Sequence, residues 1–180
     1  MLTSYNECLN IFGSDYQINK KISSGSLYKI SSGIYSDTKR TNELEIISFK
    51  YPYAVFTMDS AFYYHSLTDV IPDKYYLATQ KDATKISSSK VKQYFHRDNI
   101  FEIGITDIDY QGTNIKIYDT ERMLIELVRY KNKLPFDYYK EIIENYRKRI
   151  DSLDIQKLQE YISKFSRQDK IFETIELEVF

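Results

Sequence analysis

A segment near the start of the chain holds side chains of the kinds that read base edges or bind phosphate in the major groove of DNA. These side chains are Gln17, Asn19, Lys20, Lys21 and Ser23. All five lie on outer faces of a helix if residues 16–23 are helical and its two isoleucines, Ile18 and Ile22, face inward. A solvated helix face would carry much the same residues, so both interpretations stay open.

Two short strands are predicted directly after this helix. Residues 27–30 and 34–36 are rich in β-forming residues, and Gly33 between them accepts the positive φ that a tight hairpin turn needs. Lys29, Ser31 and Ser32 could hold phosphates from such a hairpin. Lysine and arginine outnumber the carboxylates within residues 1–40 by a net charge of only +2, and the whole chain carries −1. Any attraction to nucleic acid must therefore be local.

The predicted elements follow the order of a winged helix-turn-helix head. Ser4 can cap a first helix that ends at Phe12, and Ser14 or Asp15 can cap the second. Helix, turn, helix and hairpin then make residues 1–40 a small DNA-binding head. A polar joint within residues 37–42 separates it from a body of residues 41–180.

A second basic cluster lies in the middle of the chain. It consists of Lys81, Lys85, Lys90, Lys92 and Arg97, opposed only by Asp82. A phosphate-rich partner could bind here. An ordinary solvated loop beside a strand edge would have the same composition, and this alternative also stays open.

Catalysis has little support in the residue types. The chain has two histidines, His65 and His96, and one cysteine, Cys8, which excludes an intramolecular disulfide. No glycine-rich phosphate loop, metal-binding carboxylate pair or His-Glu-x-x-His pattern accompanies them. We predict no catalytic residues, no metal site and no cofactor, and we predict that His65 is a partly buried histidine with satisfied hydrogen bonds. A nucleotide-processing enzyme without a recognisable motif is the remaining enzymatic alternative.

Tyrosine is unusually frequent, with 18 residues, while tryptophan is absent. Neighbouring pairs such as Tyr63 and Tyr64 could stack on bases. Alternatively, the rings pack into the protein while the hydroxyls stay in contact with water.

The body is predicted to be mixed, so the fold class is α+β with a helical C-terminal third. Residues 54–56 and 75–79 read as strands around a helix over 60–66, and alternation over 100–117 predicts a hairpin turning at Gln111-Gly112. Asp119, Pro135 and Asp154 each begin a helix, and 171–180 is a strand or helix packed on the body. No apolar run of about 18 residues exists for a membrane span, so we expect a cytoplasmic protein without membrane contact.

Three segments resemble the AbiEi-type antitoxins of bacterial abortive-infection operons. The first is residues 59–69, with the sequence DSAFYYHSLTD, followed by Pro72. The second is residues 27–35, LYKISSGIY, which is similar to that family's exit from a winged helix. The third is residues 118–126, YDTERMLIE. The three occur in the family's order and are spread over most of the chain.

The resemblance implies a transcriptional regulator and antitoxin of a type IV toxin-antitoxin system for phage defence. Its head would bind operator DNA upstream of its own gene and repress its own operon, either as a two-fold dimer or by cooperative binding at inverted half-sites. Its body would counteract a nucleotidyltransferase toxin without having to bind it directly, and the second basic cluster could then contact DNA or the toxin's nucleotide or RNA substrate. Family heads often carry a further helix before the turn, so this head would be a trimmed one. The alternative is a protein-interaction module with a vestigial head that does not bind DNA.

Overall fold

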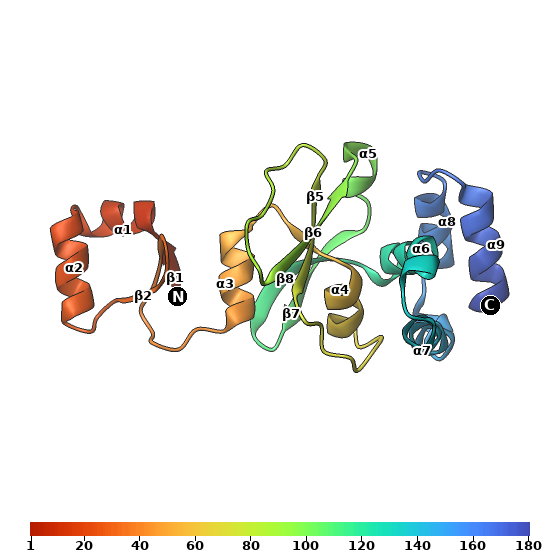
Figure 1. Ribbon diagram of the computed structural model, residues 1–180, viewed down its shortest axis with the longest axis horizontal. Helices are drawn as coiled ribbons and strands as arrows, with labels where there is room; N and C mark the ends of the chain where they lie inside the picture. Colours follow the sequence, from red (N-terminus) through yellow and green to blue (C-terminus); the bar gives the residue numbers. More distant parts are fainter. The chain divides into compact units, whose positions relative to one another are not determined.

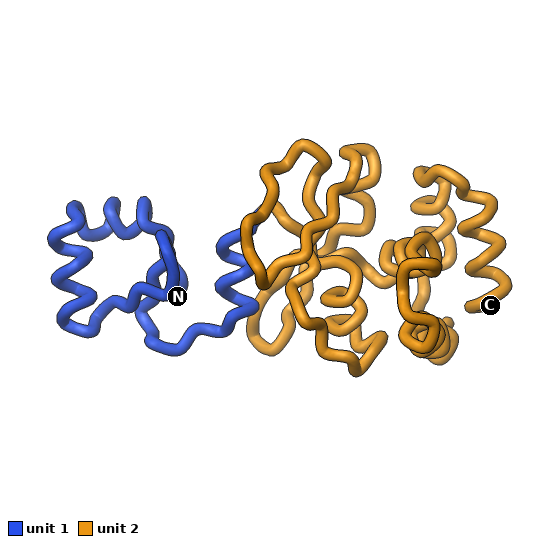
Figure 2. Tube along the Cα trace, in the orientation of Figure 1, with its two compact units in different colours: residues 1–52 blue, residues 53–180 orange.

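The computed structural model describes residues 1–180, and the chain forms two compact units, residues 1–52 and 53–180 (Figures 1 and 2). The division falls after the third helix, beyond the boundary expected near residue 40. Both units combine helices with a sheet, which confirms the α+β fold class. None of the helices has the length and apolar character that crossing a bilayer requires.

Unit 1 is a three-stranded antiparallel sheet with two helices between its first and second strands. Its elements are β1 (Leu2–Ser4), α1 (Tyr5–Phe12), α2 (Asp15–Ser23), β2 (Tyr28–Ser31), β3 (Ile34–Ser36) and α3 (Glu43–Lys50). The sheet order is β1-β3-β2, so the hairpin β2-β3 receives the first strand along β3. The two helices and the hairpin occur where the sequence predicts them, whereas β1 was not predicted.

Capping residues explain where the first two helices begin and end. The Ser4 side chain accepts a bond from the Glu7 amide, and the Glu7 carboxylate accepts one from the Ser4 amide, which makes a capping box. Gly13 ends α1 with φ +82°, a left-handed conformation that glycine adopts without steric cost. Ser14 then caps α2 through the Gln17 amide.

Unit 2 contains a five-stranded mixed sheet. Its strands are β4 (Val55–Phe56), β5 (Tyr75–Gln80), β6 (Val91–His96), β7 (Ile105–Tyr110) and β8 (Thr113–Tyr118), in the spatial order β6-β5-β4-β8-β7. The pairs β4-β5 and β7-β8 are antiparallel, whereas β5-β6 and β4-β8 are parallel. The predicted turn at Gln111 and Gly112 closes the β7-β8 hairpin, and both residues have positive φ, as a type I′ turn requires.

Six helices accompany this sheet, and the last four of them lie together on one side of it in Figure 1. The six are α4 (Met58–Tyr64), α5 (Asp98–Phe101), α6 (Thr120–Tyr130), α7 (Phe136–Arg147), α8 (Ile155–Ile162) and α9 (Gln168–Glu178), with short 3-10 turns at Lys131–Lys133 and Ile150–Ser152. Of these, α6 contacts α4, α8 and α9, which makes it the central helix of the unit. The C-terminal third is helical, as predicted, and its last segment is a helix rather than a strand.

The predicted hairpin over 100–117 is wrong at its beginning. Residues 98–101 form α5, and β7 begins only at Ile105. Gly104 has φ +78°, and a Cβ there would lie 2.5 Å from the Cβ of Arg122. The chain therefore turns at Gly104 against α6, and this turn interrupts the apolar alternation that suggested a continuous strand.

Charged side chains of α6 lie inside unit 2. Arg122 and Glu126 are fully buried and joined by a contact of 2.7 Å, and Glu126 also binds Arg129 at 2.8 Å. Arg122 donates further bonds to the carbonyl groups of Ile100 and Ile103. The buried arginine thus holds the segment before β7 against α6.

Candidate nucleic-acid interface

The face of α2 that points away from the unit 1 core carries the predicted DNA-reading residues. Ile18 is buried with Cys8, Leu27 and Tyr35, and Ile22 packs against the same cluster. Because these two isoleucines define the inner side of α2, the other faces are left to solvent. The exposed residues include Gln17, Asn19, Lys20, Lys21 and Ser23, all of which were predicted to be available there.

The hairpin presents only part of the predicted phosphate-binding set. Lys29 and Ser32 are exposed. The Oγ atom of Ser31 is buried and has no hydrogen-bond partner. A register shift between Lys29 and Ser31 in the β2-β3 pairing accounts for this placement, because a bulge changes which side of a strand a residue faces. Of the two hydroxyls, only that of Ser32 is therefore placed for a phosphate.

The carboxylates of residues 1–40 are all engaged in internal contacts. Glu7 binds the amide and hydroxyl of Ser4, and these bonds lower its pKa. Asp15 accepts a hydrogen bond from the Tyr5 hydroxyl at 2.8 Å. The terminal ammonium group of Met1 pairs with Asp37 and lowers the pKa of its carboxyl group.

The cations of the same segment are arranged differently. Every one of them is exposed and takes part in no ion pair; they are Lys20, Lys21, Lys29, Lys39 and Arg40. Their charges are available to an external anion. Lys20 and Lys21 also lie in the last turn of α2, where positive charge interacts favourably with the helix dipole.

Tyr16 was not singled out from the sequence, although it belongs to this surface. Its side chain is 72 % exposed, and it precedes Lys20 by one helical turn. An aromatic ring at this spacing from a lysine, and outside the stripe of Ile18 and Ile22, was the available signal. Such a ring can pack against a sugar or a base.

The second basic cluster is spread along one edge of the unit 2 sheet. All five predicted residues, Lys81, Lys85, Lys90, Lys92 and Arg97, are exposed. Gln80 pairs with His96, so Lys81 and Arg97, which follow them, lie at one end of the two parallel strands. Lys92 lies opposite Tyr76, near the other end. At about 3.3 Å per residue, five residues of strand separate the two groups by about 16 Å. The structure therefore presents an edge with separated charges rather than one compact site.

Internal contacts occupy part of this edge. The Lys92 ammonium group lies over the rings of Tyr76 and Tyr94, at 4.9 and 5.7 Å. Gln93 anchors the preceding loop by accepting a bond from the Ile86 amide and donating to Thr79 and Thr84. These contacts give the segment a structural role in addition to any binding role.

The tyrosine pairs mostly contact one another within unit 2. The rings of Tyr64 and Tyr110 lie 4.6 Å apart, and those of Tyr76 and Tyr94 stack at 6.2 Å. Burial raises the pKa of Tyr94 to about 12. These rings are packed against the protein, unlike the exposed ring of Tyr16.

The histidines and the cysteine do not meet in one site. Cys8 is buried in the core of unit 1, and burial raises the pKa of its thiol. His65 Nε2 lies 2.7 Å from the carbonyl oxygen of Tyr118, so this nitrogen carries the hydrogen. Burial lowers the pKa of His65, which keeps the ring neutral near pH 7. His96 is buried too, beside the ring of Tyr118.

Comparison with known proteins assigns no family to the chain. No protein-family model and no curated protein matches the chain. The three segments that resemble the antitoxins have identifiable roles in the structure. Residues 27–35 form the hairpin of unit 1, residues 59–69 contain most of α4, and residues 118–126 begin α6 with its buried Arg122 and Glu126.

Proposed function

We propose that unit 1 binds DNA and that the protein is a transcriptional regulator. The observation that carries the proposal is the charge arrangement of residues 1–40, in which every carboxylate has an internal contact and every lysine and arginine is exposed without an ion pair. Attraction of such unpaired cations to phosphate, with release of counterions, supplies most of the affinity of proteins for DNA.

In this proposal α2 is the recognition helix. Gln17 and Asn19 can hydrogen-bond base edges, while Lys20 and Lys21 reach bases or phosphates in the major groove. Lys29 and Ser32 on the hairpin contact the flanking backbone. The sheet order β1-β3-β2 supports this arrangement, because it holds the hairpin and the two helices in one small unit.

We further propose that the regulator is the antitoxin of a type IV toxin-antitoxin system. Support comes from the resemblance of the three segments, which lie in both units. In this role unit 1 represses the operon that encodes the protein, and unit 2 counteracts a nucleotidyltransferase toxin. Direct contact between the two proteins is not required.

A pair of matched variants tests the regulator proposal. Lys20→Ala with Lys21→Ala should weaken binding to the DNA upstream of the gene by about ten-fold or more at 0.1 M salt, since each lost phosphate contact removes a released counterion. Lys148→Ala with Lys164→Ala removes the same charge from exposed positions of unit 2 and should change affinity less than two-fold, within the usual range of about 0.5 kcal/mol for surface changes. Equal weakening by both pairs would indicate attraction to total charge and contradict a recognition surface on α2.

An exposed apolar hollow in unit 2 favours a second candidate, a protein-interaction module. It has a volume of about 360 Å³, and its lining includes Val70, Ile71, Leu134 and Pro135. Val70 and Ile71 are adjacent and are 52 % and 74 % exposed, and contiguous exposed apolar side chains are typical of interaction surfaces. If this candidate is right, Ile71→Asp should abolish co-purification of the partner protein that the wild-type chain retains, while the lysine variants of α2 should have no effect on it.

A further inference from the structure

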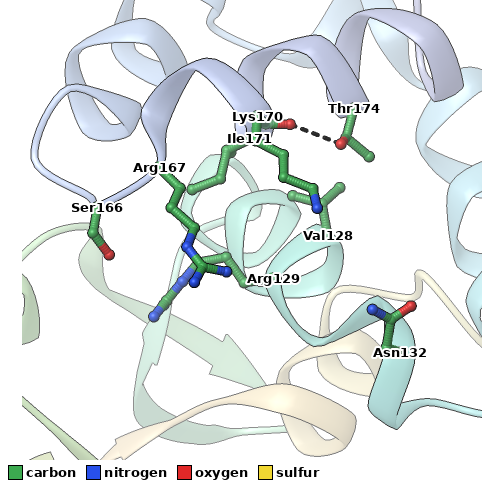
Figure 3. A pocket seen from close by; sticks show the side chains of 8 residues that line it. All are labelled: Val128, Arg129, Asn132, Ser166, Arg167, Lys170, Ile171 and Thr174. Atoms are coloured by element: carbon green, nitrogen blue, oxygen red, sulfur yellow. Dashed lines mark hydrogen bonds between the residues drawn. The ribbon is translucent and has the colours of Figure 1, made fainter.

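A hollow between α6 and α9 has no part in the DNA-binding proposal. Its volume is about 380 Å³, and its lining includes Arg129 from α6 and Arg167 and Lys170 from the start of α9 (Figure 3). Val128 and Ile171 give it apolar walls. None of the residues that line it is acidic. The hollow therefore combines three cations with no carboxylate of its own.

The positive charge of Arg129 is only partly compensated. Its guanidinium group lies 2.9 and 2.8 Å from the two carboxylate oxygens of Glu126. The same carboxylate also binds Arg122 at 2.7 and 3.1 Å. One buried negative charge is thus shared between two arginines, and this cluster retains a net charge of +1. The Arg129 side chain remains 29 % exposed, so it can bind a further anion.

The two cations from α9 have no anionic partner. Arg167 and Lys170 form no ion pair, and the charged groups of both side chains make no hydrogen bond within the chain. In Figure 3 the Arg167 side chain extends from the beginning of α9 toward Arg129. The nearest carboxylate along α9, Asp169, lines a different hollow with Gln159 and Phe172. It is therefore not among the residues that line the hollow between α6 and α9.

The backbone at Arg167 adds a second feature. Its φ of +62° is left-handed, which costs a non-glycine residue about 1 kcal/mol or more. No side chain caps the first turn of α9, so its amide groups are available to an acceptor. The positive end of the helix dipole lies in the same turn as Lys170, where the Asp169 carboxylate offsets part of it.

We propose that this hollow binds the phosphate group of a small phosphomonoester. A dianionic phosphate matches the surplus of cations, and guanidinium groups offer paired donors that suit phosphate oxygens. The volume lies within the range of about 300–1,000 Å³ found for small-molecule sites. Val128 and Ile171 would contact the organic part of the ligand, and the amide of Asn132, which has no hydrogen bond within the protein, would fix its orientation. The site is independent of whether unit 1 binds DNA.

Calorimetric titration of the purified chain tests this inference. Adenosine 5′-monophosphate should bind with one site per chain, inorganic phosphate should compete with it, and adenosine should not bind. Arg167→Asn and Lys170→Gln should each weaken binding by about ten-fold, the usual contribution of a charge-assisted hydrogen bond. Asparagine tolerates the left-handed conformation at position 167, so the fold should be retained, which an unchanged melting temperature would verify.

A matched control and two outcomes decide the question. Lys164→Ala removes one exposed charge just before α9 without touching the hollow, and it should alter affinity less than two-fold. If Lys164→Ala weakened binding as much as Lys170→Gln does, the proposal would be overturned. It would also be overturned if neither the nucleotide nor inorganic phosphate bound saturably. Weaker binding of duplex DNA by Arg167→Asn, combined with no binding of the monophosphate, would also overturn it, because the anion recognised by this hollow would then be a phosphodiester.

Discussion

Replacing Glu126 by glutamine tests the buried charges of α6. Glu126 is fully buried and is the only carboxylate that binds the guanidinium group of Arg122, whose side chain is also fully buried. The amide of glutamine fills the same volume but removes the negative charge, so Arg122 keeps its charge in a dry environment. Breaking a buried pair in this way usually costs about 3–5 kcal/mol. This loss is a large part of a total stability that is typically about 5–15 kcal/mol.

Urea denaturation followed by circular dichroism at 222 nm measures this loss. With a urea dependence of about 2 kcal/mol per molar, a loss of 4 kcal/mol moves the midpoint of unit 2 by about 2 M. Glu144→Gln serves as the control, because Glu144 pairs with Lys140 at 3.8 Å with half or more of both side chains exposed. That change should cost less than about 0.5 kcal/mol.

A double variant separates the charge effect from the loss of packing. Arg122→Met combined with Glu126→Leu removes both buried charges and keeps similar volume, so it should cost less than the sum of the two single changes. The carbonyl groups of Ile100 and Ile103 would still lose their donor, which sets a residual cost of about 1–3 kcal/mol. A loss below about 1 kcal/mol for Glu126→Gln would refute the description of a desolvated pair.

Three further predictions concern stability. Gly104→Ala should destabilise unit 2 by about 2–4 kcal/mol in urea denaturation, because the new Cβ would lie 2.5 Å from a side-chain carbon of α6. Gly112 has a similar φ, but a Cβ there would meet no atom within 4 Å, so Gly112→Ala should cost only about 1–2 kcal/mol. Burial lowers the pKa of both His65 and His96 below 6.5, so on acidification the unfolded state binds protons before the folded state does. The contribution of the two neutral rings to the free energy of unfolding should therefore be complete above about pH 6.5 and decrease toward pH 5. A free energy of unfolding that does not change over this range would show that the rings are not held neutral. Ser4→Ala should lower the protection of α1 amides in hydrogen exchange by about 1 kcal/mol, and unchanged protection would contradict the capping box.

Much of the fold follows from local signals in the sequence. Caps at Ser4, Ser14, Asp119 and Asp154 begin helices where they were expected, because a cap satisfies backbone donors within a few residues of itself. The turn of the β7-β8 hairpin is local in the same sense.

Elements that depend on distant partners were missed or misplaced. β1 has three residues and exists because it pairs with β3, and no pattern within residues 2–4 encodes that pairing. β6 is an edge strand with mostly polar or partly exposed residues, so it lacks the alternation of a half-buried strand. The strand expected from residue 100 onward is interrupted by Gly104, whose conformation is determined by contact with α6.

The candidate site residues were likewise predictable where local spacing determines their exposure, and unpredictable where distant contacts do. The exposed face of α2 could be predicted, because the spacing of Ile18 and Ile22 fixes which residues remain outside. The buried hydroxyl of Ser31 depends on a bulge that the sequence does not mark. The hollow formed by Arg129, Arg167 and Lys170 could not be predicted, because its residues come from two helices that are distant in sequence and meet only after unit 2 has folded.

Fluorescence anisotropy across a salt series tests the central claim most directly. The purified chain is titrated into labelled DNA from upstream of its own gene and into a scrambled duplex of the same length. We predict selective binding to the upstream DNA that weakens with salt on a slope of about four phosphates or more. Equal binding to both duplexes, or no binding to either, would contradict the proposal that unit 1 reads DNA and would favour the interaction module instead.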